Sequence, residues 1–566
     1  MKQILAAWQE TAEYQDSKRA LRQGSAALIS GLPLTLRAIA AAAAFLESGQ
    51  AQLLLTAEEE EAMQLYENLL PLVGERVLHF PVLELLPFEV YAHNIELTAA
   101  RVDVLTRLLQ GEQVLVVACV SAITRKLIPP ADFAAHQLKL KRGSIFQPAE
   151  LARILADMGY ERVSLTEIPG TFSLRGSLID VFPLTARQPS RLEFFDDEID
   201  GIRFFDPAEQ LSGAAASELI ISPAREMPLS DPARRRARAA LAEEMAKVRE
   251  GLHGQAKREL DKTFGPLREF LEQRVWDNGM ETLLGLFYPE AGSIFDYLSN
   301  GLVVISEPQA VKQVALELKT ERDNRYYDLL NNGRLLPSFY YNFLDYQQLF
   351  QGFSAYPLLL LCQLSLNTGG VKVAVDRQIL ARELPAYAQN PQLFQDDMLE
   401  FNRKGYQVAL AASSELRLQR MGEILVENGL PQARLLRAGF TLGFESPSLK
   451  LALVTEKELF ARQNKKRHRR VYKGGEKIAN FLDLKTGDYV VHIYQGIGQY
   501  LGVERLTLGE IQRDYLLIRY AGEDKLYVPV DQLDLIQKYI GGDGAAPKLY
   551  KLGGGEWARV KAKARG

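Results

Sequence analysis

The sequence predicts a multidomain α/β protein, and three observations lead to this prediction. The chain has 566 residues, which at roughly 150 residues a domain is enough for about four domains. From Ala26 to about Pro130, short apolar segments alternate with segments of helical period, the pattern of a parallel sheet flanked by helices. After residue 484 the pattern changes to short strands separated by glycine-rich turns, which predicts a small antiparallel β-barrel.

Charge and hydropathy argue against a protein with a globally basic surface and against a membrane or secreted protein. The formal net charge is −4, so any contact with nucleic acid or an anionic membrane has to come from a local basic patch. No apolar run approaches the ~20 residues of a membrane span, and residues 1–10 lack the long apolar core of a signal peptide. We therefore expect a cytoplasmic protein.

The cysteines and histidines predict no metal site. Cys119 and Cys362 each lie within an apolar run, and the six histidines form no cluster with the spacing of metal ligands. Both cysteines are expected to be buried structural thiols.

The segment from residue 31 to 38, GLPLTLRA, has the position of a phosphate-binding loop without its chemistry. A working loop reads G-x-x-x-x-G-K-[ST], because glycines let the backbone wrap the phosphates, lysine contacts them and the hydroxyl holds Mg²⁺. Gly31 keeps the first position, but Leu36 replaces the second glycine, Arg37 the lysine and Ala38 the hydroxyl residue. We expect an ordinary strand-to-helix turn that binds no nucleotide.

A compact α+β module is predicted next, from about 133 to 212. It contains a strand-like stretch, a helix at QPAELARILADMGY and two further strand-like runs. A long charged helical region follows at 231–275, and its arginine run at 234–238 fits either a solvated helix face or a nucleic-acid contact. The strand-like GLVVISE at 301–307 predicts a return to the first sheet, which makes the module an insertion.

A further α/β unit is predicted from about 352 to 460, with strands at YPLLLLCQL, YQVALAA and LKLALVT. The basic stretch RQNKKRHRRVYKGG, 462–475, has no apolar period and fits either a solvated tether or a contact with a phosphate backbone. The sequence ends at Gly566 inside a helix-like run, which favours a truncated chain.

Two sets of motifs carry a resemblance to known families. IPGTFSLRGSLIDVFPL, 168–184, and RLEFFDDEIDGIRFFD, 191–206, resemble the module shared by the excision-repair protein UvrB and the bacterial transcription-repair coupling factor. LELLPFEVYAHNIELTAARVDVLTRLL, 83–109, and LKTGDYVVHIYQGIGQYLGV, 484–503, are similar to the coupling factor alone. The likeness runs from about residue 26 to the end and is weak from 350 to 460.

The resemblance implies a domain order. The N-terminal domain would be UvrB-like with a degenerate phosphate loop, and the C-terminal barrel would be of the SH3/Tudor-like, CarD-type kind. The expected parts are 1–132 and 213–350 for the UvrB-like domain, 133–212 for an inserted UvrA-binding module, 351–460 for an α/β domain of unassigned role, 461–483 for a basic linker, 484–545 for the RNA polymerase-interacting barrel and 546–566 for the start of a connector helix.

The implied function is the N-terminal half of a transcription-coupled nucleotide-excision repair factor. Such a chain would recruit UvrA to RNA polymerase stalled at DNA lesions, through the polymerase β subunit. The family's motor, an ATP-dependent, helicase-like DNA translocase, has no counterpart here, since no G-x-x-G-x-G-K-T or D-E-x-H box is present. ATP, Mg²⁺ and most contacts with double-stranded DNA are therefore expected only of the missing motor, and this chain is expected to be a monomer without cofactors.

Two alternatives belong to other classes. One is a UvrB-like protein that handles damaged DNA, which needs a competent phosphate loop and an aromatic-rich hairpin for base stacking. Phe80, Phe88 and Tyr91 are the only aromatic residues from 80 to 109, too few for such a hairpin. The other is a stand-alone CarD-type regulator that binds polymerase, which leaves the upstream 460 residues without a role.

The resemblance places the UvrA contact at Arg175, Arg191 and Phe195. Strand alternation independently puts Arg191, Glu193 and Phe195 on one face and leaves Leu192 on the other. An exposed aromatic beside arginine has the composition of an interface anchor. The alternative is that Phe195 belongs to the core and the arginines pair with the acids at 196–198.

The resemblance places the polymerase contact on the barrel. Residues 501–511, LGVERLTLGEI, have mixed polarity on both strand faces, which favours an edge strand open to strand addition. Leu506 is the predicted centre of the contact, with Val503, Leu508 and Tyr527 beside it. The alternative is that Leu506 belongs to the barrel core.

Overall fold

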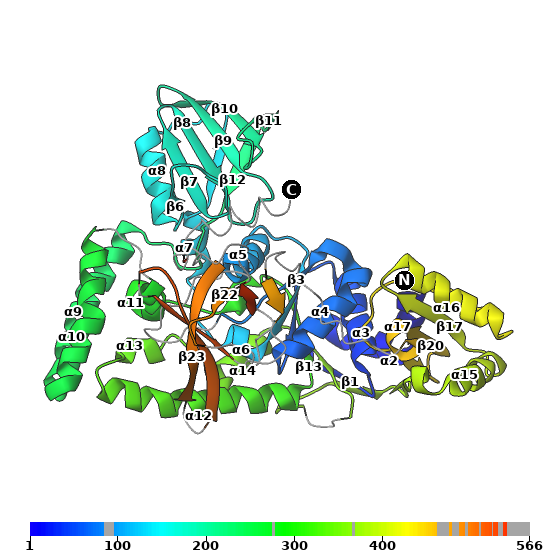
Figure 1. Cartoon of the computed structure of the whole chain (residues 1–566). Coiled ribbons are helices and arrows are strands. Elements are labelled where there is room, and N and C mark those ends of the chain that lie inside the picture. The colour runs from blue at the N-terminus through cyan, green and yellow to red at the C-terminus, as the bar shows by residue number, and fades with distance from the viewer. Residues whose placement is uncertain are drawn as a thin grey trace.

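The computed structural model describes most of the chain (Figure 1). The described residues are 1–83, 95–273, 278–364, 368–460, 475–477, 486–492, 496–508, 511–522, 524–529, 536–539 and 549. Phe88, Tyr91, the basic linker at 461–474 and the tail from 550 lie outside them. No helix in the described ranges has the length and hydropathy needed to cross a membrane.

A seven-stranded sheet forms the centre of the largest unit. Its order is β15-β1-β14-β13-β2-β4-β3, and every pairing is parallel. Most of its strands are buried along their whole length, as the apolar runs of a doubly covered parallel sheet require. The bounds are β1 (Ala27–Ser30), β2 (Gln52–Thr56), β3 (Val77–His79), β4 (Leu115–Cys119), β13 (Leu302–Ser306), β14 (Leu358–Leu361) and β15 (Val375–Gln378).

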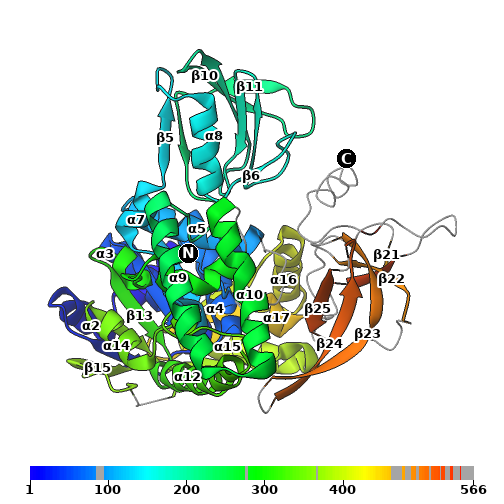
Figure 2. The ribbon, with the colours of Figure 1, turned by 90° about the vertical axis from the view of Figure 1, so that its left-hand side faces the viewer.

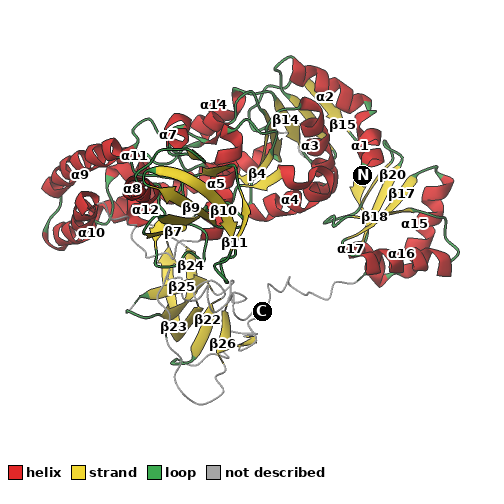
Figure 3. Ribbon diagram, turned by 90° about the horizontal axis from the view of Figure 1, so that it is seen from above, coloured by secondary structure: helices red, strands yellow, loops and turns green. Residues whose placement is uncertain are grey.

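Helices from both halves of the chain surround this sheet (Figures 1 and 3). Between the strands lie α3 (Leu34–Ser48), α4 (Glu59–Val73), α5 (Ile95–Leu109), α6 (Val120–Ile123), α12 (Pro308–Asn331) and α14 (Tyr346–Ser354). The chain begins with α1 (Lys2–Gln9), which contacts α3, and α2 (Ala12–Arg22). Shorter helices are α7 (Pro130–Ala135), α11 (Leu284–Phe287) and α13 (Pro337–Tyr340).

The strand predicted at 301–307 does return to the first sheet, as β13, but one other assignment was wrong. The pattern placed YPLLLLCQL in the later α/β unit, whereas β14 pairs with β1 on one side and β13 on the other. Its four leucines are buried between these strands, and β15 adds a further strand beyond β1. The central sheet therefore extends to Gln378.

The module from 138 to 221 stands apart above the central unit (Figures 1 and 2). Its six-stranded sheet has the order β11-β10-β9-β8-β7-β6, and α8 (Pro148–Asp157) contacts β7 and β8. A separate pair joins β5 (Leu138–Lys141) to β12 (Glu218–Ile221). The other strands are β6 (Glu161–Arg162), β7 (Thr171–Arg175), β8 (Leu178–Phe182), β9 (Ser190–Phe195), β10 (Glu198–Phe205) and β11 (Ser212–Ala215).

The charged helical region folds back on itself as α9 (Asp231–Gly251) and α10 (Gly254–Gln273), which pack side by side. Its arginine run has a structural use that neither sequence interpretation included. Arg234 is buried and pairs with Asp157, Arg236 donates to the Phe287 carbonyl oxygen at 2.8 Å, and Arg238 pairs with Glu272. Three of the arginines thus fasten α9 to its neighbours.

The second α/β unit has a five-stranded sheet of order β16-β19-β20-β17-β18. Figure 3 shows it with α15 and α16, away from the C-terminal strands. Its bounds are β16 (Arg382–Glu383), α15 (Pro391–Arg403), β17 (Gln407–Ala412), α16 (Glu415–Glu427), β18 (Arg434–Arg437), β19 (Phe444–Ser446), β20 (Leu451–Thr455) and α17 (Glu456–Leu459).

The C-terminal strands form a six-stranded sheet of order β21-β26-β22-β23-β24-β25, with antiparallel pairing throughout. Tyr500, Leu516, Ile518 and Val528 contribute to its small core. Closure of this sheet into an SH3/Tudor-like barrel stays a prediction. The bounds are β21 (Gly475–Lys477), β22 (Tyr489–His492), β23 (Gly496–Leu508), β24 (Ile511–Arg519), β25 (Lys525–Pro529) and β26 (Ile536–Tyr539).

This sheet is expected to lose stability in mild acid because of His492. Burial lowers the pKa of His492 from 6.5 to about 4. Between pH 6.5 and pH 4 the imidazole is therefore protonated in the unfolded state and neutral in the folded state. Between pH 7 and pH 5 the free energy of unfolding is therefore expected to fall by about 2 kcal/mol. The measurement is hydrogen exchange of β22 and β23, corrected for the intrinsic pH dependence. His492→Gln should flatten the profile, and an equal decline in that variant would refute the assignment.

Candidate interaction sites

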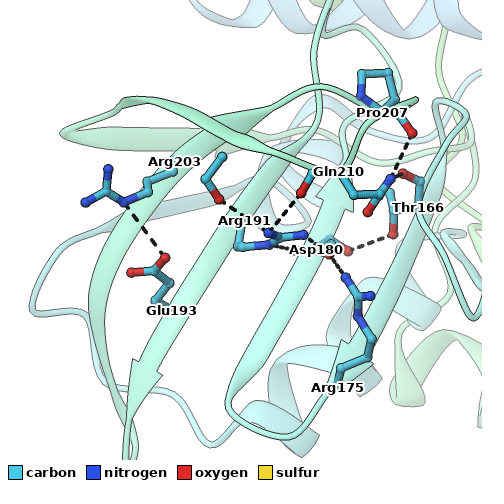
Figure 4. A network of polar contacts seen from close by, with 9 residues as sticks. Thr166, Arg175, Asp180, Arg191, Glu193, Arg203, Pro207 and Gln210 are labelled. Carbon is cyan, nitrogen blue, oxygen red and sulfur yellow. Dashed lines mark hydrogen bonds and ion pairs between the residues drawn. The ribbon is translucent and has the colours of Figure 1, made fainter.

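Two of the residues predicted to contact UvrA, Arg175 and Arg191, lie on one face of the inserted module (Figure 4). Asp180 on β8 is buried and accepts hydrogen bonds from two arginines on the neighbouring strands. Arg191 on β9 donates through Nε at 2.7 Å and through Nη2 at 3.0 Å, a bidentate contact, and Arg175 on β7 donates to Oδ2. The buried carboxylate thus holds both guanidinium groups on the face opposite α8.

Further contacts fix Arg191 more firmly than Arg175. The Arg191 guanidinium lies 4.8 Å from the Phe205 ring centre and donates to the Gln210 carbonyl oxygen at 3.4 Å. Its hydrogen bonds to Asp180 raise its pKa above the usual value. The Arg191 side chain is 14% exposed, whereas that of Arg175 is 43% exposed. Arg175 is therefore the more accessible of the two charges.

Phe195, at the end of β9, is 79% exposed, so the alternative that placed it in the core is wrong. The prediction that Arg191, Glu193 and Phe195 share one strand face agrees with the alternating burial of β9. The paired acid is Asp180 and not one of the residues 196–198. That these three residues bind UvrA stays a prediction.

The sequence did not identify Asp180 as part of this face. The signal was present, because a single acid inside the apolar strand LIDVF has to find a cation when the strand is buried. Strand alternation alone could not identify the arginines that pair with Asp180, because these contacts depend on the register between β7, β8 and β9.

The degenerate phosphate loop is occupied by the protein's own groups. The Gly31 and Leu32 amides donate to the carbonyl oxygens of Gln363 and Cys362, at 3.2 and 3.0 Å. A Cβ atom at Gly31 would lie 1.9 Å from the Ile379 carbonyl oxygen, so another segment of backbone covers this turn. Leu36 and Ala38 are fully buried in α3.

Arg37, which replaces the lysine of a working loop, is committed to internal contacts. Its guanidinium is buried and donates to Glu61 at 2.7 Å and to the Ser306 hydroxyl at 2.6 Å. Glu307 lies 3.3 Å away. These carboxylates neutralise the charge that would otherwise meet a phosphate.

The residues predicted to contact polymerase lie on β23 and β25. β23 pairs with β22 only through residues 496–499, whereas residues 502–508 pair with β24 alone among the described strands. The second half of β23 therefore has an open edge there. Val503 is 38% exposed and Tyr527 is half-buried, while the side chains of Leu506 and Leu508 lie outside the described part.

The cysteines are buried, as expected. Burial raises the pKa of the Cys119 and Cys362 thiols to about 12. Cys119 donates to Glu59 at 3.0 Å, and the other oxygen of Glu59 lies 3.0 Å from His79 Nε2. No group of acids, cysteines and histidines in the described ranges has the geometry of a metal site.

Comparison with known protein families identifies two domains in this chain. The UvrB interaction domain family matches residues 138–227, which include Arg175, Arg191 and Phe195. The CarD-like/TRCF RID domain family matches residues 484–540, which include β22 to β26. The chain is thus a multidomain α/β protein that carries both interaction domains.

The similarity to one family of proteins covers nearly the whole chain. The chain is 33% identical over 556 residues to the transcription-repair-coupling factor of Bacillus subtilis (strain 168), which covers 95% of this chain and 47% of that protein. It is 29% identical over 572 residues to the transcription-repair-coupling factor of Staphylococcus aureus (strain MRSA252), covering 98% and 48%. The resemblance stated from the motifs is confirmed, and the chain spans about half the length of these relatives.

Proposed function

We propose that this chain is the recruitment part of a transcription-coupled excision-repair factor, which binds UvrA through the inserted module and RNA polymerase through the C-terminal sheet. The observation that carries the proposal is the presence of both interaction domains in one chain. The names of the relatives support it. Bringing the two partners onto one chain raises the local concentration of UvrA at the polymerase without any catalytic step.

The module's part in this proposal follows from its charged face. Asp180 acts as a positioning residue that presents Arg175 and Arg191, and Phe195 projects beside them as an apolar anchor. A large aromatic exposed on an otherwise polar face has the composition of a protein interface centre. The arginines favour an acidic partner surface.

The polymerase side of the proposal rests on the open edge of β23. We place the contact on the β subunit, with a strand of that subunit pairing along residues 502–508. Closure of the sheet into an SH3/Tudor-like barrel over 484–545, and the domain limits given from the sequence, are parts of the same proposal. The proposal also includes that the chain is a monomer. It further includes that an ATP-dependent DNA translocase occupies the part of the relatives that this chain does not cover.

Phe195→Ala is expected to weaken UvrA binding by at least about 30-fold, because truncating an anchor aromatic often costs 2 kcal/mol or more. The measurement is a titration of UvrA against the immobilised chain. Leu416→Ala is the matched control, because Leu416 is 78% exposed on α16 and outside the module. Equal affinities of wild type and Phe195→Ala would remove Phe195 from the contact.

No saturable ATP binding is expected for this chain. The loop lacks the lysine, the second glycine and the Mg²⁺ hydroxyl, and Arg37 is paired with Glu61 and Glu307. Equilibrium dialysis with labelled ATP and Mg²⁺ measures this. Saturable binding at micromolar nucleotide would overturn the prediction.

A further inference from the structure

A cavity of about 380 Å³ lies where the middle of α12 meets the segment 340–351, and none of the residues assigned above lines it. Figure 1 shows α12 along the lower edge of the central unit, near α13 and α14. Three cations line the cavity from two directions, Lys319 and Arg322 from α12 and Lys126 from the chain after α6. Three aromatic residues, Tyr340, Tyr341 and Phe343, also line the cavity.

Two of the cations, Lys126 and Arg322, form no ion pair within 4.0 Å in the described part of the chain, although Asp323 and Asp345 lie near enough to Arg322 to act on its charge. Arg322 makes no ion pair there, its Nε atom is buried without a hydrogen-bond partner among the described residues, and burial lowers its pKa. Its guanidinium lies 4.7 Å from the Phe343 ring centre. The Lys126 ammonium also has no ion pair with a described residue. A bound anion would compensate the remaining positive charge.

The acids near the cavity are already engaged. Asp323 accepts hydrogen bonds from Lys319 at 2.6 Å and from the Tyr340 hydroxyl at 2.6 Å. Asp345 caps α14 by accepting from the Gln348 amide at 2.9 Å. Asp345 also lines the cavity, so Lys126, Lys319 and Arg322 together face Asp323 and Asp345, which leaves a positive excess of one charge.

Four tyrosines form a continuous chain of ring contacts beside these cations. The ring centres of Tyr327 and Tyr326 lie 5.7 Å apart, those of Tyr326 and Tyr340 5.0 Å, and those of Tyr340 and Tyr341 6.2 Å. The two ends of the chain are exposed, Tyr327 by 65% and Tyr341 by 67%. Tyr341 thus combines an accessible ring with a place in the cavity wall.

We propose that this cavity binds single-stranded nucleic acid, with one phosphate between Lys126 and Arg322 and one base stacked on Tyr341. Unpaired bases offer the ring faces that stacking needs, whereas a duplex hides them. An exposed tyrosine next to unpaired cations is the arrangement by which proteins hold single strands without reading their sequence. A volume of this size accommodates one nucleotide unit. This surface and its ligand go beyond the protein partners proposed above.

The test is fluorescence anisotropy of the full chain with a labelled 15-nucleotide oligodeoxythymidine at low salt. Tyr341→Ala is expected to weaken binding by about 5- to 100-fold through the lost stacking. Lys126→Ala is expected to reduce the slope of log K against log salt by about 0.7. Lys404→Ala is the control, because Lys404 is a lysine on the other α/β unit paired with Glu400, and its affinity should match wild type.

Several results would overturn the proposal. Wild-type affinity in both Tyr341→Ala and Lys126→Ala would exclude the cavity, and Arg322→Gln adds a third variant at the same site. Equal affinity for an oligonucleotide with abasic sites would show charge attraction without stacking. Tighter binding of the duplex, or equally strong displacement by polyglutamate, would assign the surface to duplex DNA or to an acidic peptide. Matching melting curves show that the variants are folded, and Tyr341 is exposed enough for its truncation to be tolerated.

Discussion

Asp180→Ala is expected to be the most damaging single substitution on the arginine face of the inserted module. It removes the only buried acid that Arg175 and Arg191 share on this face of the described sheet, and it leaves Arg191 largely buried without its charge partner. Breaking a buried ion pair from one side costs about 3 to 5 kcal/mol of unfolding free energy. UvrA capture should fall with it, because the guanidinium groups lose the atom that positions them.

A second variant separates folding from recognition. Asp180→Asn keeps the size of the side chain and one oxygen acceptor, so the module should stay folded while UvrA affinity falls by about tenfold, the effect of one lost charged hydrogen bond. Asp200→Ala is the control, since Asp200, on β10 of the same sheet, forms an exposed ion pair with Arg142, and such pairs contribute at most about 1 kcal/mol. Circular dichroism and UvrA titration measure the two effects. Wild-type UvrA affinity in a folded Asp180→Asn variant would show that the charge of Asp180 does not position the arginines for UvrA.

Leu506→Arg is expected to abolish capture of RNA polymerase without unfolding the C-terminal sheet. Residues 502–508 pair with β24 on one side only in the described part, so a partner strand has room on the other side. A charge placed inside the new interface would be buried without a partner, which costs several kcal/mol. Polymerase pull-down and the melting curve of the chain measure the two outcomes.

Two control variants show how a core substitution and a surface substitution behave in this sheet. Leu516→Arg places a charge in the small core of the sheet and should unfold it, because Leu516 is fully buried on β24. Lys525→Ala, at an exposed position on β25, should change neither stability nor capture. If Leu506→Arg melts like Leu516→Arg, Leu506 is a core residue. If it folds and still captures polymerase, the contact moves to Tyr527 and β25.

Local patterns predicted most elements of this fold. Apolar runs identified β1, β2, β4 and β13, and period-two alternation identified the exposed face of β9. The sheet to which a strand belongs was harder to predict, because the apolar run at 358–361 has the same sequence pattern whether it joins the first sheet or the next unit. Only its pairing with β1 and β13, more than fifty residues away along the chain, decides this.

Some of the site residues could be predicted from the sequence and others could not. Composition and resemblance selected Arg175, Arg191 and Phe195, and the geometry of the module is consistent with that choice. The partners of Arg37 and the cavity on α12 could not be predicted, since both bring together segments remote in sequence. Glu61 and Ser306 meet at Arg37, and Lys126 meets Arg322 and Tyr341. Single-sequence spacing carries no information on such contacts.

The most direct test of the proposed recruitment function is a bridging experiment with purified components. RNA polymerase is immobilised, and UvrA retention is measured with and without this chain. UvrA should be retained only when the chain is present, Phe195→Ala should release UvrA while the chain stays on the polymerase, and Leu506→Arg should release both. Equal UvrA retention with and without the chain, or binding of the two partners only in mutually exclusive complexes, would contradict the proposal that this chain joins them.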